Sequence, residues 1–216
     1  MQLSKIKNWF FDCDGVLLDS NKIKTDGFYE IALPYGTDVA LKLRDYHTAH
    51  GGISRFHKMK YFITDILKEK LHEKLLNDLV NAYGNFCYSK MLEAEETPGL
   101  RDLLAKLYKN TNCFVVSGGS EAELKDIFAA RKLSKYFNGI FGSPRDKMQI
   151  ISELFSDNKA EIPAVFIGDS KYDYVVAENF KLKFVFMQQF TEFNDWENFF
   201  KSKDVQIINN LKELID

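Results

Sequence analysis

Near its N-terminus the chain reads Ile6-Lys7-Asn8-Trp9-Phe10-Phe11-Asp12-Cys13-Asp14-Gly15, and this stretch decides the fold. Aromatic and branched residues run together from Ile6 to Asp12, which is typical of a short buried strand. The run ends at the Asp14-Gly15 pair, which favours a turn. Two aspartates therefore follow directly on a strand that is expected to lie in the interior.

The second half of the chain alternates two kinds of apolar pattern. Runs of β-branched and aromatic residues predict strands at 113–117, 139–142, 164–168 and 184–187. Apolar residues at helical spacing predict helices at 100–107, 121–130, 148–155 and 172–180. Such alternation is typical of a parallel sheet covered by helices on both faces. We therefore predict an α/β fold with a Rossmann-like, doubly wound parallel sheet as its core.

Between these regions the pattern is helical throughout. From Ser20 to about Glu96 apolar residues recur at three- and four-residue spacing, with an internal break at Gly51-Gly52 and an end at Thr97-Pro98-Gly99. We predict an inserted, all-helical cap domain at residues 20–96. Residues 1–19 and 97–216 would then form the Rossmann-like catalytic core, with hinges near 18–21 and 95–99.

The composition disfavours several classes of protein. Lys and Arg number 29 against 31 Asp and Glu, so the formal net charge of −2 leaves no basic surface for nucleic acid. No stretch approaches the ~20 apolar residues of a membrane span, and Asp12 and Asp14 interrupt the N-terminal apolar stretch too early for an export signal. The three cysteines, Cys13, Cys87 and Cys113, have no metal-binding or redox spacing. We expect a cytoplasmic monomer or homodimer without nucleic-acid or membrane partners.

Polar residues follow the predicted strands at the end where an open parallel sheet binds ligands. In chain order these residues are Asp12, Asp14, Ser117, Gly118, Lys147, Asp169 and Asp173. Four carboxylates at one site would repel one another without a cation, and an all-oxygen ligand set favours magnesium over zinc. The sequence therefore predicts Mg²⁺ as a cofactor, close to Asp12, Asp14, Asp169 and Asp173.

These residue types suit phosphoryl transfer. Asp12 needs no base to ionise it at neutral pH, because the reference pKa of aspartate is ~3.9, and it could attack phosphorus directly. Asp14, two residues later, could protonate the leaving oxygen and later accept a proton from water. Mg²⁺ and Lys147 would offset the repulsion between a phosphate and Asp12. Ser117 and the Gly118 amide would bind the phosphoryl oxygens.

These same residues carry a family resemblance. Residues 11–20, Phe-Asp-Cys-Asp-Gly-Val-Leu-Leu-Asp-Ser, resemble the first motif of the haloacid dehalogenase superfamily phosphatases. Ser117-Gly118 resembles the second motif, Lys147 the third, and Gly168-Asp169 with Asp173 the fourth, in the family's order. The resemblance extends over essentially the whole chain. The most similar subfamily contains phosphoglycolate phosphatase and β-phosphoglucomutase, which carry a helical cap.

The resemblance implies a role for each motif residue. Asp12 would be the nucleophile and Asp14 the acid/base, while Ser117 and Lys147 would bind phosphate. Asp12, Asp169 and the Asp14 carbonyl would hold magnesium, with Asp173 orienting that shell.

Residues of the insertion are candidates for contact with the substrate. Arg55 lies in a glycine-flanked loop that could close over the site and hold an anionic or hydroxyl-rich substrate, the alternative being an arginine on the surface. His47, His50 and His57 lack acidic neighbours at metal-ligand spacing, so contact with substrate is the better interpretation of them.

Other conspicuous residues have structural interpretations. Asp19 is expected to cap or hinge the chain into the insertion, and Cys13 to be a small buried residue. Lys171 is a competitor for the role of Lys147, which we favour. Aromatic residues between 190 and 200 are expected to pack in the core.

The predicted function is hydrolysis of a small phosphomonoester, of the sugar phosphate or phosphoglycolate type, through an aspartyl phosphate on Asp12. The expected partner is thus a small phosphorylated metabolite. A phosphomutase of the β-phosphoglucomutase type is an alternative, and a non-catalytic phosphate-binding regulatory module is a weaker one. A dehalogenase is disfavoured, because Asp14 would have no task in halide displacement.

Overall fold

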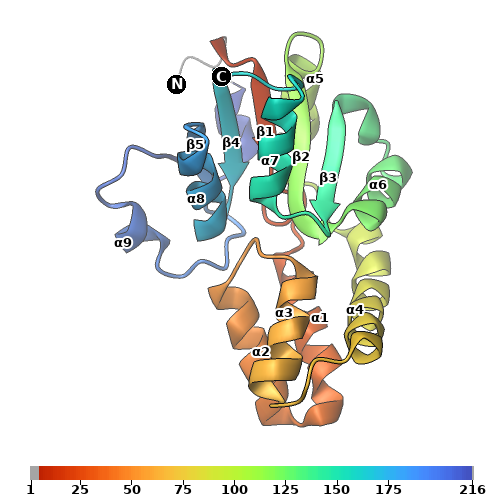
Figure 1. Cartoon of the computed structure of the whole chain (residues 1–216). Helices are drawn as coiled ribbons and strands as arrows, with labels where there is room; N and C mark the ends of the chain where they lie inside the picture. The colour runs from red at the N-terminus through yellow and green to blue at the C-terminus, as the bar shows by residue number, and fades with distance from the viewer. Residues whose placement is uncertain (1–4, 216) are drawn as a thin grey trace.

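Six short strands form one open sheet in the computed structural model, which describes residues 5–215 (Figure 1). Neighbouring strands are all parallel and follow the order β3-β2-β1-β4-β5-β6. The strands are β1 (Asn8–Phe11), β2 (Asn112–Ser120), β3 (Gly139–Ser143), β4 (Ala164–Gly168), β5 (Lys183–Met187) and β6 (Gln206–Ile208). Because β1 lies in the middle, the residues that follow it lie between those that follow β2 and β4.

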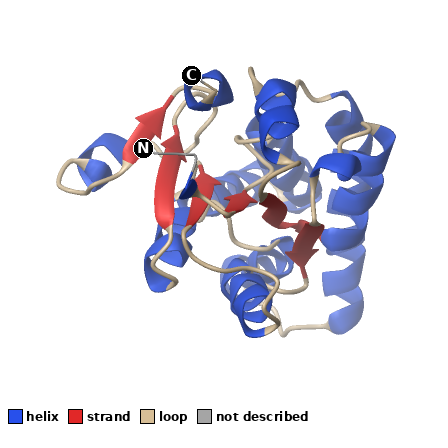
Figure 2. Ribbon diagram, turned by 90° about the horizontal axis from the view of Figure 1, so that it is seen from above, coloured by secondary structure: helices blue, strands red, loops and turns tan. Residues whose placement is uncertain are grey.

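Alternate residues of each strand enter two separate apolar layers. Trp9 and Phe11 lie in one layer and Phe10 in the other, and all three are fully buried. The first layer includes residues of α5 (Leu100–Leu107) and α6 (Glu121–Ala130), and the second includes residues of α7 (Lys147–Ser156), α8 (Lys171–Asn179) and α9 (Trp196–Phe200). Seen from above, helices flank the row of strands (Figure 2). The doubly wound α/β fold is confirmed.

Most predicted strands and helices of this part lie within one or two residues of their expected bounds. β2 is longer than predicted and continues to Ser120. The short edge strand β6 was not predicted, since its three residues include Gln206 and show no clear apolar run. Phe200 is buried and Trp196 and Phe199 pack against the second apolar layer, as the aromatic pattern predicts.

The segment between β1 and α5, which the structure describes in full, contains helices, turns and two isolated β-bridges, but no strand. Its elements are α1 (Asn21–Ala32), η2 (Leu33–Tyr35), α2 (Thr37–Ala49), α3 (Arg55–Tyr61), η3 (Phe62–Ile66) and α4 (Glu73–Glu93). They gather at one end of the sheet, with α1 packed on α2 and α4, and α3 on α4 (Figure 1). No helix within residues 5–215 is both long enough and apolar enough to cross a membrane.

Both connections between the sheet and these helices run side by side. The backbone N–H of Asp19 donates to the carbonyl of Glu95 at 2.9 Å, and that of Thr97 to the carbonyl of Leu17 at 3.1 Å. This arrangement fits an insertion with adjacent entry and exit. The division into a core of residues 1–19 and 97–216 and a cap of residues 20–96 stays a prediction, and residues 1–4 lie outside the described part of the chain.

Candidate active site

The register of the central strands brings the predicted site residues together. Phe11 lies opposite Val115 of β2 and Ile167 of β4, so the next residue of β1, Asp12, lies beside the ends of both neighbouring strands. The Asp12 N–H donates to the Ile167 carbonyl at 3.0 Å. Asp169 therefore comes close to Asp12 although 157 positions separate them in the sequence.

Lys147 joins two buried carboxylates. Its Nζ lies 2.8 Å from Asp12 Oδ2 and 2.5 Å from Asp173 Oδ1, and all three side chains are at most 5% exposed. Burial lowers the pKa of Lys147, but the two carboxylates outweigh burial and raise it above its usual value. Burial also raises the pKa of Asp12 to about 7, against the lowering effect of Lys147. The competing Lys171 is exposed, so Lys147 is the lysine that contacts Asp12.

Three buried carboxylates form a cluster of the kind that holds a metal ion. Oxygen atoms of Asp12, Asp169 and Asp173 lie within 4.8 Å of one another. Burial, together with the charges of Asp12 and Asp173, raises the pKa of Asp169 well above its ordinary value. Lys147 supplies one positive charge to three carboxylates, and all the donors are oxygens. The residues present thus fit a hard divalent cation such as Mg²⁺.

Hydrogen bonds from neighbouring residues orient the carboxylates of Asp169 and Asp173. Asp173 stands at the third position of α8, and its Oδ2 accepts from the Ser170 hydroxyl at 2.7 Å and from the Ser170 N–H at 3.2 Å. The Asp169 Oδ2 accepts from Asn21 Nδ2 at 2.6 Å. Asn21 is the first residue of α1, so the helical segment contributes directly to this site.

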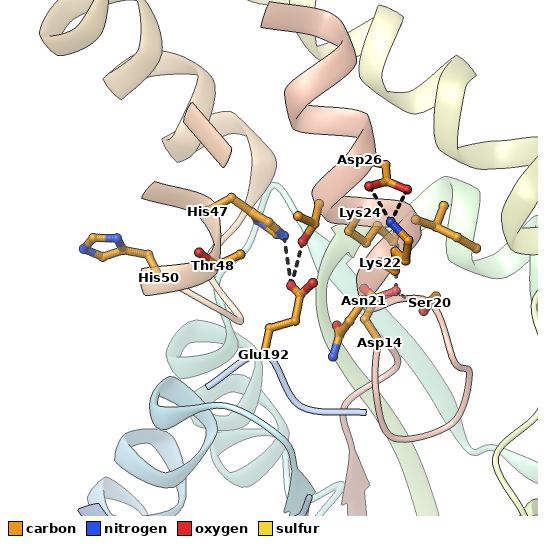
Figure 3. Close-up of polar contacts among 12 residues, drawn as sticks. Asp14, Ser20, Asn21, Lys22, Lys24, Asp26, His47, Thr48, His50 and Glu192 are labelled. Atoms are coloured by element: carbon orange, nitrogen blue, oxygen red, sulfur yellow. Dashed lines mark hydrogen bonds and ion pairs between the residues drawn. The ribbon is translucent and has the colours of Figure 1, made fainter. Parts of the chain in front are cut away.

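Asp14 lies beside Ser20 and Lys24, at the start of the helical segment (Figure 3). Its Oδ1 accepts from the Ser20 hydroxyl at 2.6 Å and lies 3.6 Å from Lys24 Nζ. The Asp14 side chain keeps 18% of its surface exposed, more than Asp12 does. Asp14 nevertheless lines the same cavity as Asp12.

Gly15 allows the turn between the two aspartates and the helices. Its φ of +76° is strained for other residues, and an added Cβ would lie 2.4 Å from both Asn21 Nδ2 and Asp169 Oδ2. We expect Gly15→Ala to lower the free energy of unfolding by about 1–3 kcal/mol. Urea denaturation would measure the loss, with Gly36→Ala as the control because a Cβ at Gly36, also at positive φ, meets nothing within 4 Å. An equal loss in both variants would mean that backbone strain, and not crowding of the site, is responsible.

A cavity of about 370 Å³ opens in front of Asp12. The sheet side of its wall includes Asp12, Asp14, Asp169 and Gly118. Ser117 is fully buried behind that wall, where its hydroxyl accepts from the Gly119 N–H at 3.0 Å. The loop between α2 and α3 lies directly over Gly118, because a Cβ there would meet the Gly52 carbonyl oxygen at 2.7 Å. The helical segment thus covers the site closely.

The helices supply the opposite wall of the cavity. Arg55 lines it and is 4% exposed, so the alternative of a surface arginine is wrong. Its guanidinium is paired with Glu123 of α6 at 2.8 and 2.6 Å. His47 and His50 also line the cavity, whereas His57 is exposed. Whether Arg55 or a histidine contacts a ligand stays a prediction.

The lining residues that the sequence did not single out include four with polar side chains. They are Lys24 of α1, Lys58 of α3, Tyr83 of α4 and Glu192 after β5. Lys24 and Lys58 are buried, at 7% and 2% exposure. Lysine and glutamate are usually solvated, so nothing in the local sequence marks these as cavity residues. Only the packing of the helices against the end of the sheet brings them there.

Comparison with known proteins identifies a family whose model spans the residues of this site. Residues 9–187 match the family model described as haloacid dehalogenase-like hydrolase. The chain belongs to this family. The match covers β1 through β5 and includes every residue of the carboxylate cluster and Lys147. No curated protein sequence matches the chain.

Solved structures of haloacid dehalogenase-like and related proteins share the fold. A "predicted phosphatase" from Clostridium acetobutylicum has a TM-score of 0.75 at 20% identity, with 98% of this chain and 97% of that chain covered. β-Phosphoglucomutase from Clostridium difficile has a TM-score of 0.73 at 18% identity, covering 97% and 93%. A "predicted phosphoglycolate phosphatase" from Haemophilus somnus has a TM-score of 0.72 at 17% identity, covering 99% and 98%. At these identities the likeness establishes the common fold.

Proposed function

We propose that the protein is a magnesium-dependent phosphatase that hydrolyses a small phosphomonoester, of the sugar phosphate or phosphoglycolate type, through an aspartyl phosphate on Asp12. The observation that carries this proposal is the placement of the Asp12 carboxylate. It lies on the floor of a cavity, 2.8 Å from the buried Lys147 ammonium and within 4.8 Å of two further carboxylates. Membership of a hydrolase family supports the same conclusion.

In the first step an Asp12 oxygen attacks phosphorus and the bond from phosphorus to the ester oxygen breaks. Asp14 gives a proton to the departing alkoxide, which leaves as an alcohol. In the second step Asp14 takes a proton from water, whose oxygen attacks phosphorus and releases inorganic phosphate and the Asp12 carboxylate. Lys147 balances the negative charge, while the Ser117 hydroxyl and the Gly118 N–H are the proposed donors to the phosphoryl oxygens.

Asp12, Asp169, Asp173 and the Asp14 carbonyl are the proposed magnesium site. A bound Mg²⁺ would supply positive charge that lets an anionic phosphate approach Asp12. The raised pKa values of Asp12 and Asp169 support this, since burial and mutual repulsion leave the cluster with charge that one lysine does not balance.

The helical segment is the proposed cap domain of residues 20–96, and Arg55 is its proposed contact with the substrate. By covering Asp12 it would exclude bulk water during transfer. The three cysteines, Cys13, Cys87 and Cys113, are buried and unpaired, which supports a reducing, cytoplasmic setting.

The decisive experiment is phosphate release from a panel of small phosphomonoesters, with and without Mg²⁺. We expect Mg²⁺-dependent release that a chelator stops. The likeness to β-phosphoglucomutase favours a phosphomutase as the second candidate. A mutase would convert a sugar phosphate to its isomer and require a bisphosphorylated activator, and product analysis separates the two. The absence of both reactions would contradict the proposal.

Metal binding can be tested without any substrate. We expect millimolar Mg²⁺ to raise the melting temperature of the native protein by about 4–8 °C, because the ion binds only the folded carboxylate cluster. Asp169→Asn should remove most of this rise, since it keeps the shape of the side chain and loses its charge. Asp204→Asn, at an exposed position, is the control. A rise of equal size in all three proteins would place the ion elsewhere.

A further inference from the structure

The buried cations of the protein differ in what balances their charge. Among residues 5–215, four lysine and arginine side chains are buried: Lys24, Arg55, Lys58 and Lys147. Lys147 is paired with two carboxylates, Arg55 with Glu123, and Lys24 with Asp14. Lys58 has no carboxylate within 4.0 Å among the described residues, and its nearest polar partner is His47. Among these four buried cations, Lys58 is therefore the one without a carboxylate in direct contact.

The surroundings of Lys58 hold the ammonium without neutralising it. Its Nζ lies 2.7 Å from His47 Nδ1, 3.5 Å from the His47 carbonyl and 5.4 Å from the ring centre of Phe28. Burial and the charges of Lys58 and Lys24 lower the pKa of His47 well below its usual value, so the imidazole is neutral. It accepts from the ammonium through Nδ1 and carries its hydrogen on Nε2. His47 thus orients Lys58 but supplies no counter-charge.

A carboxylate does lie nearby, on the other side of the imidazole. Glu192 Oε2 is 3.9 Å from His47 Nε2 and accepts from the Thr25 hydroxyl at 2.6 Å (Figure 3). Burial lowers the pKa of Lys58 to about 7, and the more distant charges of Asp14 and Glu192 oppose this lowering without cancelling it. Removing an ammonium from water without pairing it costs free energy, and an anionic ligand in the cavity would offset that cost.

We propose that Lys58, held by His47, binds a carboxylate at the non-reacting end of the phosphorylated substrate. The inference rests on the proposed function and names the substrate class for that site. Lys58 lines the same cavity as Asp12 and Asp14, but from the opposite, helical wall. An ammonium has three N–H donors, of which His47 Nδ1 and the His47 carbonyl take two, so one remains for a ligand in the cavity. The substrate class is a compact phosphomonoester of a hydroxy acid.

Charge distinguishes a carboxylate from the other groups that a lysine can bind. A sugar hydroxyl would accept from Lys58 but leave its charge unbalanced. A second phosphate carries close to two negative charges, which one ammonium cannot balance. A carboxylate carries one charge and matches one ammonium. The cavity of about 370 Å³ also favours a small acid, since it is at the low end of the range for small-molecule sites.

The test compares three esters that differ only at the end remote from the phosphate. They are 2-phosphoglycolate, 2-hydroxyethyl phosphate and ethylene glycol bisphosphate. We expect the native protein to prefer phosphoglycolate by at least about 10-fold in kcat/KM over each of the others. Lys58→Met should reduce kcat/KM for phosphoglycolate by about 10–100-fold, mainly through KM, and for 2-hydroxyethyl phosphate by less than about 3-fold. Lys60→Met is the matched control, because Lys60 is an exposed lysine of the same helix.

Several outcomes would overturn the inference. An equal loss with all three esters would mean that Lys58 only supports the fold of the cavity, and no loss would mean that it has no role in recognition. A bisphosphate preference that disappears in Lys58→Met would assign the site to a second phosphate.

Binding measurements separate this inference from the proposed function. Calorimetry with Asp12→Asn, which cannot consume the ligand by the proposed route, should show that adding Lys58→Met weakens phosphoglycolate binding about 10–100-fold and 2-hydroxyethyl phosphate binding little. If the native protein released no phosphate from any ester, the proposed function would be wrong. The calorimetry would still show whether Lys58 binds the carboxylate. Unchanged phosphoglycolate binding would overturn the inference even in an active phosphatase.

Discussion

Asp12→Asn should stop phosphate release, with kcat reduced by at least about 1,000-fold. Asparagine has the same shape as aspartate but lacks the charged oxygen that forms the bond to phosphorus. Asp19→Asn is the matched control, since Asp19 belongs to the same stretch of chain and has no place in the proposed chemistry. Circular dichroism of both variants would show that they are folded.

The same variant tests the covalent intermediate. Rapid acid quenching during turnover, followed by mass spectrometry, should find one phosphoryl group on the peptide that contains Asp12 in the native protein and none in Asp12→Asn. Phosphate release at a near-native rate from Asp12→Asn would contradict the proposed mechanism. A phosphorylated peptide elsewhere in the chain would show that another residue is the nucleophile.

Lys147→Met should cost both activity and stability. The side chain is 1% exposed and lies between two buried carboxylates, so its removal leaves both without a counter-charge. Breaking a buried ion pair by removing one partner typically costs about 3–5 kcal/mol. We expect a loss of that size in the free energy of unfolding near pH 8. Lys171→Met, at an exposed lysine that begins α8, should change stability little.

The loss caused by Lys147→Met should depend on pH. In the native protein the pKa of Asp12 is about 7 when folded, above the 3.8 of an unperturbed aspartate. A raised folded pKa means that the folded state holds a proton that the unfolded state has released, so stability falls as pH rises through this range. Without Lys147 the pKa of the folded-state Asp12 rises further, so the pH range over which the protein loses stability extends to higher pH. Urea unfolding should therefore show a smaller loss at pH 5 than at pH 8, and a loss that is constant with pH would contradict this account.

Much of the catalytic wall could be predicted because its residues follow strands. The apolar run before Asp12 predicts a central strand, and parallel strands bring their ends to one edge. The closeness of Asp12 to Asp169 and Lys147 follows from that rule alone. The contacts themselves, such as the Lys147 ammonium between Asp12 and Asp173, depend on side-chain directions that spacing does not determine.

The helical wall could not be predicted in the same way. Helical periodicity identifies which residues are apolar and buried, and it assigns lysines to the solvated face by default. Lys58 contradicts that default, because α3 turns it toward the sheet domain instead of water. The pair of Arg55 and Glu123 likewise joins residues 68 positions apart, and although the glycine-flanked loop draws attention to Arg55, nothing local indicates Glu123 as its partner. Such residues are determined by how two groups of elements pack.

The pair of Arg55 and Glu123 has a consequence for the timing of catalysis. It joins α3, which supplies part of the cavity wall, to α6, with the arginine side chain only 3% exposed. Any outward motion of α3 away from α6 must pull the guanidinium from the carboxylate and hydrate both ions. Such a motion would act as one gate for substrate entry and product exit, and its frequency would depend on the strength of this contact. We expect the gate, and not the chemistry at phosphorus, to set the pace of turnover.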